Sequence, residues 1–218
     1  MRGCFITLEG GEGAGKTSHL QSVAEYLQQQ QIEVVITREP GGTEVSEAIR
    51  AVLLDPALPA MHADTELLLM FAARNEHLQR KIIPALQQGQ WVVCDRFTDA
   101  TYAYQGYGRK LALERISALE NWVQGELRPD YTLLLDVDVS IGMQRVKQRS
   151  QQNHVSRDRF EREQYEFYES IRQGYLQRAR QNAERFYVLN AAQSMAQVRQ
   201  EIRNTLRQII QQREVNSG

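Results

Sequence analysis

A glycine-rich segment close to the N-terminus constrains this chain more than any other feature of its sequence. The segment reads GGEGAGKT from Gly10 to Thr17 and matches the pattern G-x-x-x-x-G-K-[ST]. It lies between an apolar run that is typical of a strand and a pattern that is typical of a helix. Glycines there let backbone N–H groups fold around an anion, and the helix adds the positive end of its dipole. The motif therefore predicts a site for the phosphates of a nucleoside triphosphate.

Two side chains of this loop have distinct expected roles. Lys16 is expected to reach the β- and γ-phosphates, and the hydroxyl of Thr17 is expected to be a ligand of Mg²⁺. The residues of the predicted triphosphate site are Gly10, Gly11, Glu12, Gly13, Ala14, Gly15, Lys16 and Thr17. The loop by itself does not separate GTPases, ATPases and small-molecule kinases.

Five short apolar runs alternate with amphipathic helical patterns along the chain. The runs are residues 5–8, 34–37, 91–94, 131–135 and 186–189. Continuous apolar strands between helices are typical of a parallel sheet that is covered on both faces. A chain of 218 residues, 42% hydrophobic and 24% charged, can form one globular domain over residues 1–218. We expect a three-layer α/β fold with a five-stranded parallel sheet.

The helical patterns have recognisable ends. Before the third apolar run, Asp64 or Thr65 is a suitable N-cap, Gly89 a suitable stop, and Pro84 is expected to kink the last turns. Residues 140–182 indicate two helices, separated by a polar stretch at residues 150–154 where the periodicity fades. We interpret the segment at approximately residues 149–162 as a mobile lid.

Charge and composition exclude several classes of function. The 26 basic and 27 acidic residues give a net charge of −1, so no general field would attract nucleic acid or an anionic membrane. The longest apolar run, residues 67–73, is too short to span a bilayer. The two cysteines, Cys4 and Cys94, lie in apolar strand-like segments, which favours a reducing compartment over a disulfide framework. With no pattern of a secretory leader at the N-terminus, we expect a cytoplasmic protein.

Polar side chains follow the predicted strands. Arg38 and Arg96 come directly after the second and third strands, and Asp95 closes the third. Parallel strands end at one edge of a sheet, so we expect these side chains near the glycine-rich loop. Two arginines beside a triphosphate site indicate a second anion, although each alone could be a surface ion pair. Asp95 resembles a carboxylate that supports a metal directly or through water, and a plain strand-end cap remains an alternative.

Four motifs bring the chain into register with a known family. They are TREPGG at 37–42, FAAR at 71–74, DRF at 95–97 and AYQG at 103–106. Together with the glycine-rich loop, their order and spacing resemble thymidylate kinase over nearly the whole chain. The resemblance implies a P-loop kinase fold and phosphoryl transfer from ATP to dTMP with Mg²⁺. It also implies a homodimer packed through helices.

The resemblance implies contacts with dTMP. Phe71 would stack on thymine, Arg74 and Gln105 would bind the edge of the base, and Tyr104 would favour deoxyribose. The full set implied for dTMP is Arg38, Glu39, Pro40, Phe71, Arg74, Arg96, Thr101, Tyr104 and Gln105. Physical chemistry supports part of it, since arginine offers only donors and so suits thymine O4 better than the amino group of cytosine. The alternative is that Phe71 is a core residue and Arg74 its solvated neighbour.

Cations are the expected catalysts, because phosphoryl transfer between two nucleotides brings many negative charges together. Some family members have an arginine where Gly13 stands here, whereas the bacterial type supplies it from the lid. The resemblance favours Arg159, with Arg149 or Arg157, although an ion-paired helix face is the alternative. Glu12 would orient the acceptor and the metal, so no general base is required.

At the adenine end the resemblance implies Arg145 and the turn at Asn190, where many relatives have aspartate. Two other functions remain open from the sequence. One is another nucleoside or nucleoside-monophosphate kinase with the same core. The other is a nucleotide-dependent switch without catalysis, which would leave Arg38, Arg96 and the Phe71/Arg74 pair without a role.

Overall fold

The computed structural model describes residues 2–153 and 164–215, and its centre is one parallel sheet. The strands are β1 (Phe5–Glu9), β2 (Val34–Arg38), β3 (Trp91–Asp95), β4 (Tyr131–Asp136) and β5 (Phe186–Asn190). Their order across the sheet is β2-β3-β1-β4-β5, and all four pairings are parallel. The expected five-stranded parallel α/β fold is therefore confirmed, with the strand that precedes the glycine-rich loop in the centre.

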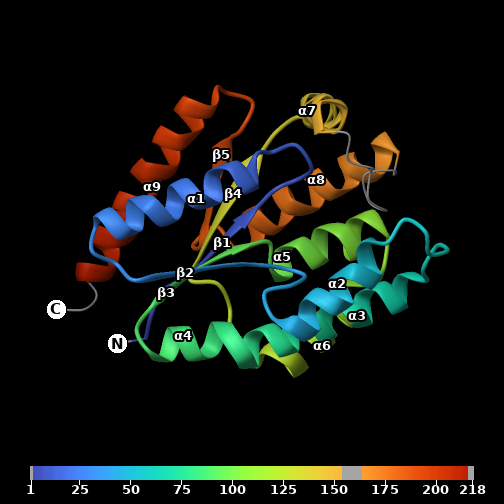
Figure 1. The fold of residues 1–218 in the computed structure, drawn as a ribbon, viewed down its shortest axis with the longest axis horizontal. Coiled ribbons are helices and arrows are strands. Elements are labelled where there is room, and N and C mark those ends of the chain that lie inside the picture. The colour runs from blue at the N-terminus through green and yellow to red at the C-terminus, as the bar shows by residue number, and fades with distance from the viewer. Residues whose placement is uncertain (1, 154–163, 216–218) are drawn as a thin grey trace.

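Helices cover both faces of the sheet (Figure 1). Helices α1 (Lys16–Gln29) and α9 (Met195–Val215) pack on one face, against Ile6 and Leu8 of β1. On the other face, Phe5 packs with residues of α4 (Ile83–Gln87). The remaining helices are α2 (Glu44–Leu54), α3 (Ala63–His77), α5 (Thr98–Thr101), α6 (Leu113–Gln124), α7 (Val139–Asn153) and α8 (Tyr165–Gln181). Because successive residues of a strand face opposite sides, a strand buried on both faces must be apolar throughout.

The long helical region before β3 departs from a regular α-helix near its end. A π-helical turn, η1 (Leu78–Ile82), joins α3 to α4, and Pro84 lies in the first turn of α4. Proline removes one backbone donor and its ring crowds the preceding turn, which accounts for a widened turn just before it. Gly89, with φ of +81°, follows α4 as expected. The predicted N-cap at Asp64 or Thr65 was wrong by two or three residues, because α3 begins at Ala63 after His62.

Two further segments bear on the site. A second π-helical turn, η2 (Tyr102–Gly108), follows α5 and packs against α8. Helix α7 ends at Asn153 and α8 begins at Tyr165, so most of the predicted lid at 149–162 lies outside the described residues, with Arg157 and Arg159. Within the described ranges no helix combines the length and the apolar character needed to cross a bilayer.

Candidate active site

The glycine-rich loop joins β1 to α1 and has a backbone that only glycine adopts easily. Gly13 has φ of +74° and Gly15 has φ of +89°, both in the left-handed region. A Cβ atom on Gly13 would lie 2.1 Å from the carbonyl oxygen of Gly142 in α7. The loop thus packs directly on α7, which leaves no space for an arginine at position 13. Gly15 is the N-cap of α1, so the loop ends at the positive end of a helix dipole.

Lys16 lies over the loop and is buried. Its Nζ atom donates to the carbonyl oxygens of Gly10, at 2.9 Å, and Gly11, at 3.0 Å. Burial, and next the guanidinium of Arg96, lower the pKa of Lys16 to about 8. The ammonium is therefore held beside the loop and has a strong electrostatic preference for an anionic partner.

A pair of oxygen donors lies at the start of α1. The hydroxyl of Thr17 donates to Asp95 Oδ2 at 3.5 Å, and Asp95 Oδ1 is buried with no hydrogen-bond partner among the described residues. A buried carboxylate oxygen without a partner fits a hard cation, and Mg²⁺ commonly takes one or two protein oxygens plus phosphates and waters. In the described part of the chain, no cluster of three or more His, Cys, Asp or Glu side chains could hold a metal. The donor set therefore suits Mg²⁺ bound together with a phosphate.

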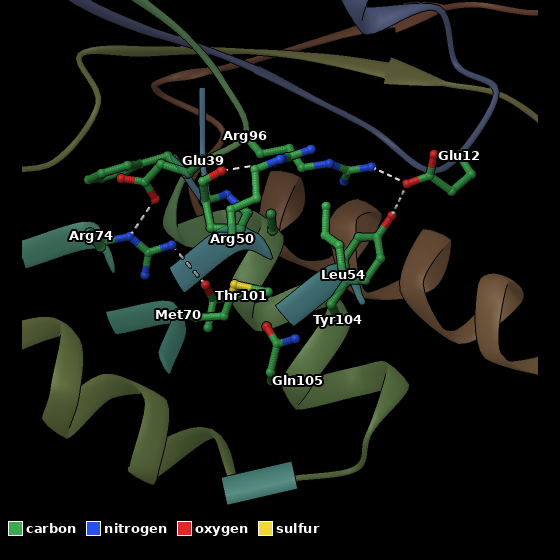
Figure 2. Close-up of a pocket in the computed structure, with 13 residues that line it drawn as sticks. Glu12, Glu39, Arg50, Leu54, Met70, Arg74, Arg96, Thr101, Tyr104 and Gln105 are labelled. Carbon is green, nitrogen blue, oxygen red and sulfur yellow. Dashed lines mark hydrogen bonds and ion pairs between the residues drawn. The ribbon is translucent and has the colours of Figure 1, made fainter. Parts of the chain in front are cut away.

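A pocket of about 640 Å³, part of it open to solvent, lies beside the loop (Figure 2). Seven of the nine side chains that the resemblance implied for dTMP line it. They are Glu39, Pro40, Arg74, Arg96, Thr101, Tyr104 and Gln105. The structure therefore brings together residues from four separate sequence motifs.

Arg96 connects the loop to the pocket. Its Nη1 atom donates to the carbonyl of Gly10 and to the hydroxyl of Tyr175, at 3.1 Å each, and its Nη2 atom pairs with Glu12. The residue has φ of +67°, which is rare for a residue other than glycine. The backbone around it is held by Glu9 Oε1, which accepts from the N–H of Phe97 at 2.7 Å. The buried carboxyl group of Glu9 thus supports the strained backbone that places Arg96.

Glu12 faces the pocket from within the loop. It accepts hydrogen bonds from Arg96 and, at 2.9 Å, from the hydroxyl of Tyr104 (Figure 2). Although burial opposes ionisation, the charges of Arg96 and then Lys16 lower the pKa of Glu12 to about 2, and Arg149 adds to this effect. A carboxylate with this pKa is a weak base. Glu12 is therefore suited to positioning Arg96 and Tyr104 rather than to accepting a proton.

The second pocket arginine is not the one that the sequence indicated. Arg38 is half exposed, pairs with Glu47 at 2.9 Å and does not line the pocket. Arg50 of α2 lines the pocket instead, and its Nη1 atom donates to the carbonyl of Pro40 at 2.8 Å. The missed signal was its spacing, because Arg50 lies on the same helical face as the buried residues Ser46 and Leu53.

A buried network explains the TREPGG motif. Glu39 accepts from Arg74 Nε at 2.7 Å and lies 3.0 Å from His77 Nδ1, while His77 Nε2 lies 2.6 Å from the hydroxyl of Thr37. A Cβ atom on Gly42 would lie 2.5 Å from the same imidazole. The motif thus supplies a carboxylate, a hydroxyl and a glycine that hold one arginine and one histidine in place.

Arg74 and Phe71 are both buried, but only Arg74 lines the pocket. Arg74 is 2% exposed, so the alternative of a solvated arginine is wrong. Its guanidinium lies 4.7 Å from the ring centroid of Phe71 and 5.0 Å from that of Phe97. Phe97 lines the pocket, whereas Phe71 is buried in the core and does not. A stacking role for Phe71 therefore stays a prediction.

The implied adenine-binding residues lie on the side of the loop near β5. Arg145 Nη1 donates to the carbonyl of Ala191 at 2.8 Å and approaches that of Gly13 at 3.4 Å. Asn190 Oδ1 accepts from the N–H of Ala192 at 3.0 Å, so its side chain stabilises the turn itself. Arg145 therefore joins the loop to this turn.

Comparison with known proteins agrees with the geometry of the site. The family model described as Thymidylate kinase matches residues 8–202. A thymidylate kinase of Ectopseudomonas mendocina is 56% identical over 202 residues, which covers 93% of this chain and 94% of the relative. One of Nitrosospira multiformis is 52% identical over 206 residues, which covers 94% and 98%. One of Pseudomonas fluorescens is 52% identical over 211 residues, which covers 97% and 98%. This chain belongs to the thymidylate kinase family, a family of enzymes that transfer phosphate from ATP.

Proposed function

We propose that the phosphates of ATP bind in the loop at residues 10–17 and that dTMP binds in the adjoining pocket, where its phosphate accepts the γ-phosphoryl group. The observation that carries this proposal is the position of Arg96, which contacts the loop at Gly10 and lines the pocket. One cation between two anion sites can offset the repulsion between donor and acceptor phosphates.

The charges near the pocket support this arrangement. ATP carries roughly four negative charges and dTMP nearly two, so their approach requires several fixed cations. Lys16, Arg50 and Arg96 supply three of them from the described residues. Arg149 is close enough to lower the pKa of Glu12. Arg157 and Arg159 remain predicted contributors, and an unchanged turnover of Arg159→Ala would remove that residue from the mechanism.

Mg²⁺ is part of the proposal. Thr17 and Asp95 would hold it together with phosphate oxygens, and the bound ion would neutralise charge on the transferring group. Glu12, held ionised by Arg96, positions that guanidinium and the hydroxyl of Tyr104. No side chain need accept a proton before transfer, because positioning and charge neutralisation carry most of the catalysis in this reaction class.

A substrate panel tests the proposal. With ATP and Mg²⁺, phosphorylation of dTMP is expected to greatly exceed that of dCMP, UMP, AMP, GMP and thymidine. Preference for thymidine would instead identify a nucleoside kinase. Saturable binding of dTMP is expected with and without a non-hydrolysable ATP analogue. Its absence in both conditions would favour a nucleotide-dependent switch.

We further propose a homodimer that forms through α3 and α6. Trp122 of α6 is 82% exposed and Leu68 of α3 is 56% exposed, and both line one shallow apolar hollow with Leu119. Large exposed apolar groups that lie together are typical of an interface. Sedimentation should show a dimer for the native chain and a monomer for Trp122→Lys. Val215→Lys, at a residue of α9 that is 81% exposed, is the control that should stay dimeric.

We propose a cytoplasmic location as well. Cys4 and Cys94 are free and buried. Burial raises the pKa of Cys4 to about 12 and that of Cys94 well above its usual value. Unpaired structural thiols are typical of proteins that work in a reducing compartment.

A further inference from the structure

Two polar groups in the pocket are not fully used by the protein itself. Arg74 Nη1 is buried and has no hydrogen-bond partner among the described residues, while the other two nitrogens of this guanidinium bind Glu39 and Thr101. The amide of Gln105 also lines the pocket, and the side chain is 1% exposed. A ligand in the pocket would therefore meet one arginine donor and one end of an amide.

Glu66 decides which end of that amide is available. This residue of α3 is fully buried, and its Oε1 atom accepts from Gln105 Nε2 at 2.8 Å. Arg109 Nε lies 3.4 Å from the same oxygen and compensates the buried charge. A carboxylate can only accept hydrogen bonds, so the nitrogen of the amide must face Glu66.

The oxygen of the Gln105 amide must then face away from Glu66. Among the described residues no donor is bound to it, and Figure 2 shows it pointing toward Thr101 and Met70 of the pocket. The pocket consequently contains an acceptor, Gln105 Oε1, as well as the unpaired donor, Arg74 Nη1.

We infer that Glu66 is a specificity-determining positioning residue, which fixes the amide of Gln105 so that the pocket presents an acceptor and a donor to the acceptor base. This inference rests on the proposed binding of dTMP in this pocket. Thymine offers N3–H as a donor and O4 as an acceptor, which complements both groups. Cytosine offers an acceptor at N3 and a donor amino group at C4, so both positions conflict.

Such conflicts discriminate strongly because they leave buried polar groups without partners. The reversed amide would present a donor to N3 and would favour cytosine at that position. Glu66 itself does not line the pocket. Its effect on specificity passes through Gln105, and the charge of the carboxylate matters because a neutral amide at position 66 could bind either end of Gln105.

The test is the ratio of kcat/KM for dTMP to kcat/KM for dCMP. Glu66→Gln keeps the size of the side chain but lets the Gln105 amide reverse. We expect the ratio to fall about tenfold, the difference between a charged and a neutral hydrogen bond. The preference for dTMP should persist, because Arg74 still presents a donor. A purely structural role of Glu66 would lower both kcat/KM values equally and leave the ratio unchanged.

A double variant gives the sharper result. In Glu66→Gln/Gln105→Glu the carboxylate and the amide exchange places, so the side chain at position 105 again presents only acceptors to the pocket. The ratio should return to within about threefold of the native value. If a change at position 66 simply damaged the pocket, the second substitution would not restore the ratio.

Glu120→Gln is the matched control. Glu120 is also a buried carboxylate that pairs with an arginine, Arg128, at 2.7 Å. It accepts a hydrogen bond from the hydroxyl of Tyr102 at 2.7 Å, and Tyr102 does not line the pocket. Replacing Glu120 should lower the melting temperature without changing the ratio. An unchanged ratio in Glu66→Gln, with a native enzyme that strongly prefers dTMP, would overturn the role of Glu66 alone. A native enzyme without that preference would overturn the placement of dTMP.

Discussion

The phosphate loop and the acceptor pocket adjoin each other and both are suited to anions, but they are built in opposite ways. The loop is one run of consecutive residues whose backbone conformation makes the site, with Gly13 packed against α7. The pocket is made by side chains from α2, α3, α5, η2 and the turns after β2 and β3, together with Glu12 of the loop. Two buried carboxylates hold pocket side chains in place: Glu39 binds Arg74, and Glu66 binds the amide of Gln105.

This difference predicts opposite sensitivities. At a loop glycine that packs closely on its neighbours, such as Gly13, adding a single carbon atom should be harmful even where no functional group is lost. In the pocket, removing a charge or a hydrogen bond should be harmful even where the backbone is unaffected. Arg96 contacts both regions, so the loop and the pocket depend on each other through this residue.

The largest effect on substrate binding should come from a charge in the pocket. Arg50→Met is expected to raise KM for dTMP about 10- to 100-fold, the value of a hydrogen bond to a charged group, with KM for ATP nearly unchanged. Arg38→Met is the matched variant, because Arg38 is half exposed and bound to Glu47. It should change either KM by less than about threefold. Steady-state kinetics with both substrates would measure this. A large increase in KM for dTMP in Arg38→Met but not in Arg50→Met would identify Arg38 as the second phosphate contact.

The next effect isolates the backbone of the loop. Gly13→Ala should destabilise the fold by about 2–3 kcal/mol, because it combines a left-handed φ with a contact against a backbone oxygen. The melting temperature should fall by roughly 4–12 °C. In Gly11→Ala the new Cβ atom would meet no atom within 4 Å, so the melting temperature should change little. Equal effects of the two variants in thermal denaturation would refute a backbone-determined loop.

Glu9 at the end of β1 and Glu12 in the loop should respond to pH in opposite directions. Burial raises the pKa of Glu9 to about 8. Between pH 4.5 and 8 the unfolded chain therefore binds fewer protons at Glu9 than the folded chain, and stability falls as pH rises. Glu9→Gln should remove roughly 2 kcal/mol of this loss between pH 6 and 8. Denaturant titrations at both pH values would measure it, and parallel pH profiles of the two proteins would contradict the raised pKa.

Glu12 provides the opposite case. Arg96 and Lys16 overcome the effect of burial and lower its pKa to about 2. Its contribution to stability is therefore present above pH 4.5 and is lost as the pH falls toward 2. Glu12→Gln should accordingly reduce the acid sensitivity of the protein in that window alone.

The smallest effect concerns the network behind Arg74. Thr37→Val removes the hydroxyl that lies 2.6 Å from His77 Nε2, which should cost about 1–2 kcal/mol of stability. The loosened Glu39–Arg74 pair should raise KM for dTMP a few-fold and leave KM for ATP unchanged. Thr205→Val removes another mostly buried hydroxyl, bound to a backbone carbonyl in α9, and should affect neither KM. A shift of KM for ATP in Thr37→Val would show that the network also serves the loop.

Most of the fold could be predicted from the sequence because its signals are local. Each of the five apolar runs became a strand at nearly the expected residues. The end of α3 was less predictable, since Pro84 acts on the turn before it and produced the π-helical segment η1. Lid residues 154–162 lie outside the described residues, so the role of Arg159 stays a prediction.

The residues of the site also fall into a group that the sequence determined and a group that the tertiary structure decided. The sequence alone determined the phosphate loop, because a chain of consecutive residues carries both its backbone requirements and its lysine and threonine. It also determined most of the side chains that meet in the pocket. Only the tertiary structure decided that Arg50 rather than Arg38 faces the pocket, and that Glu66 turns the amide of Gln105. Those outcomes depend on which side chains from separate elements share a buried space, where each donor must find an acceptor. The helical spacing of Arg50 could show which face of α2 it lies on, but not which side chains from other elements it would meet there.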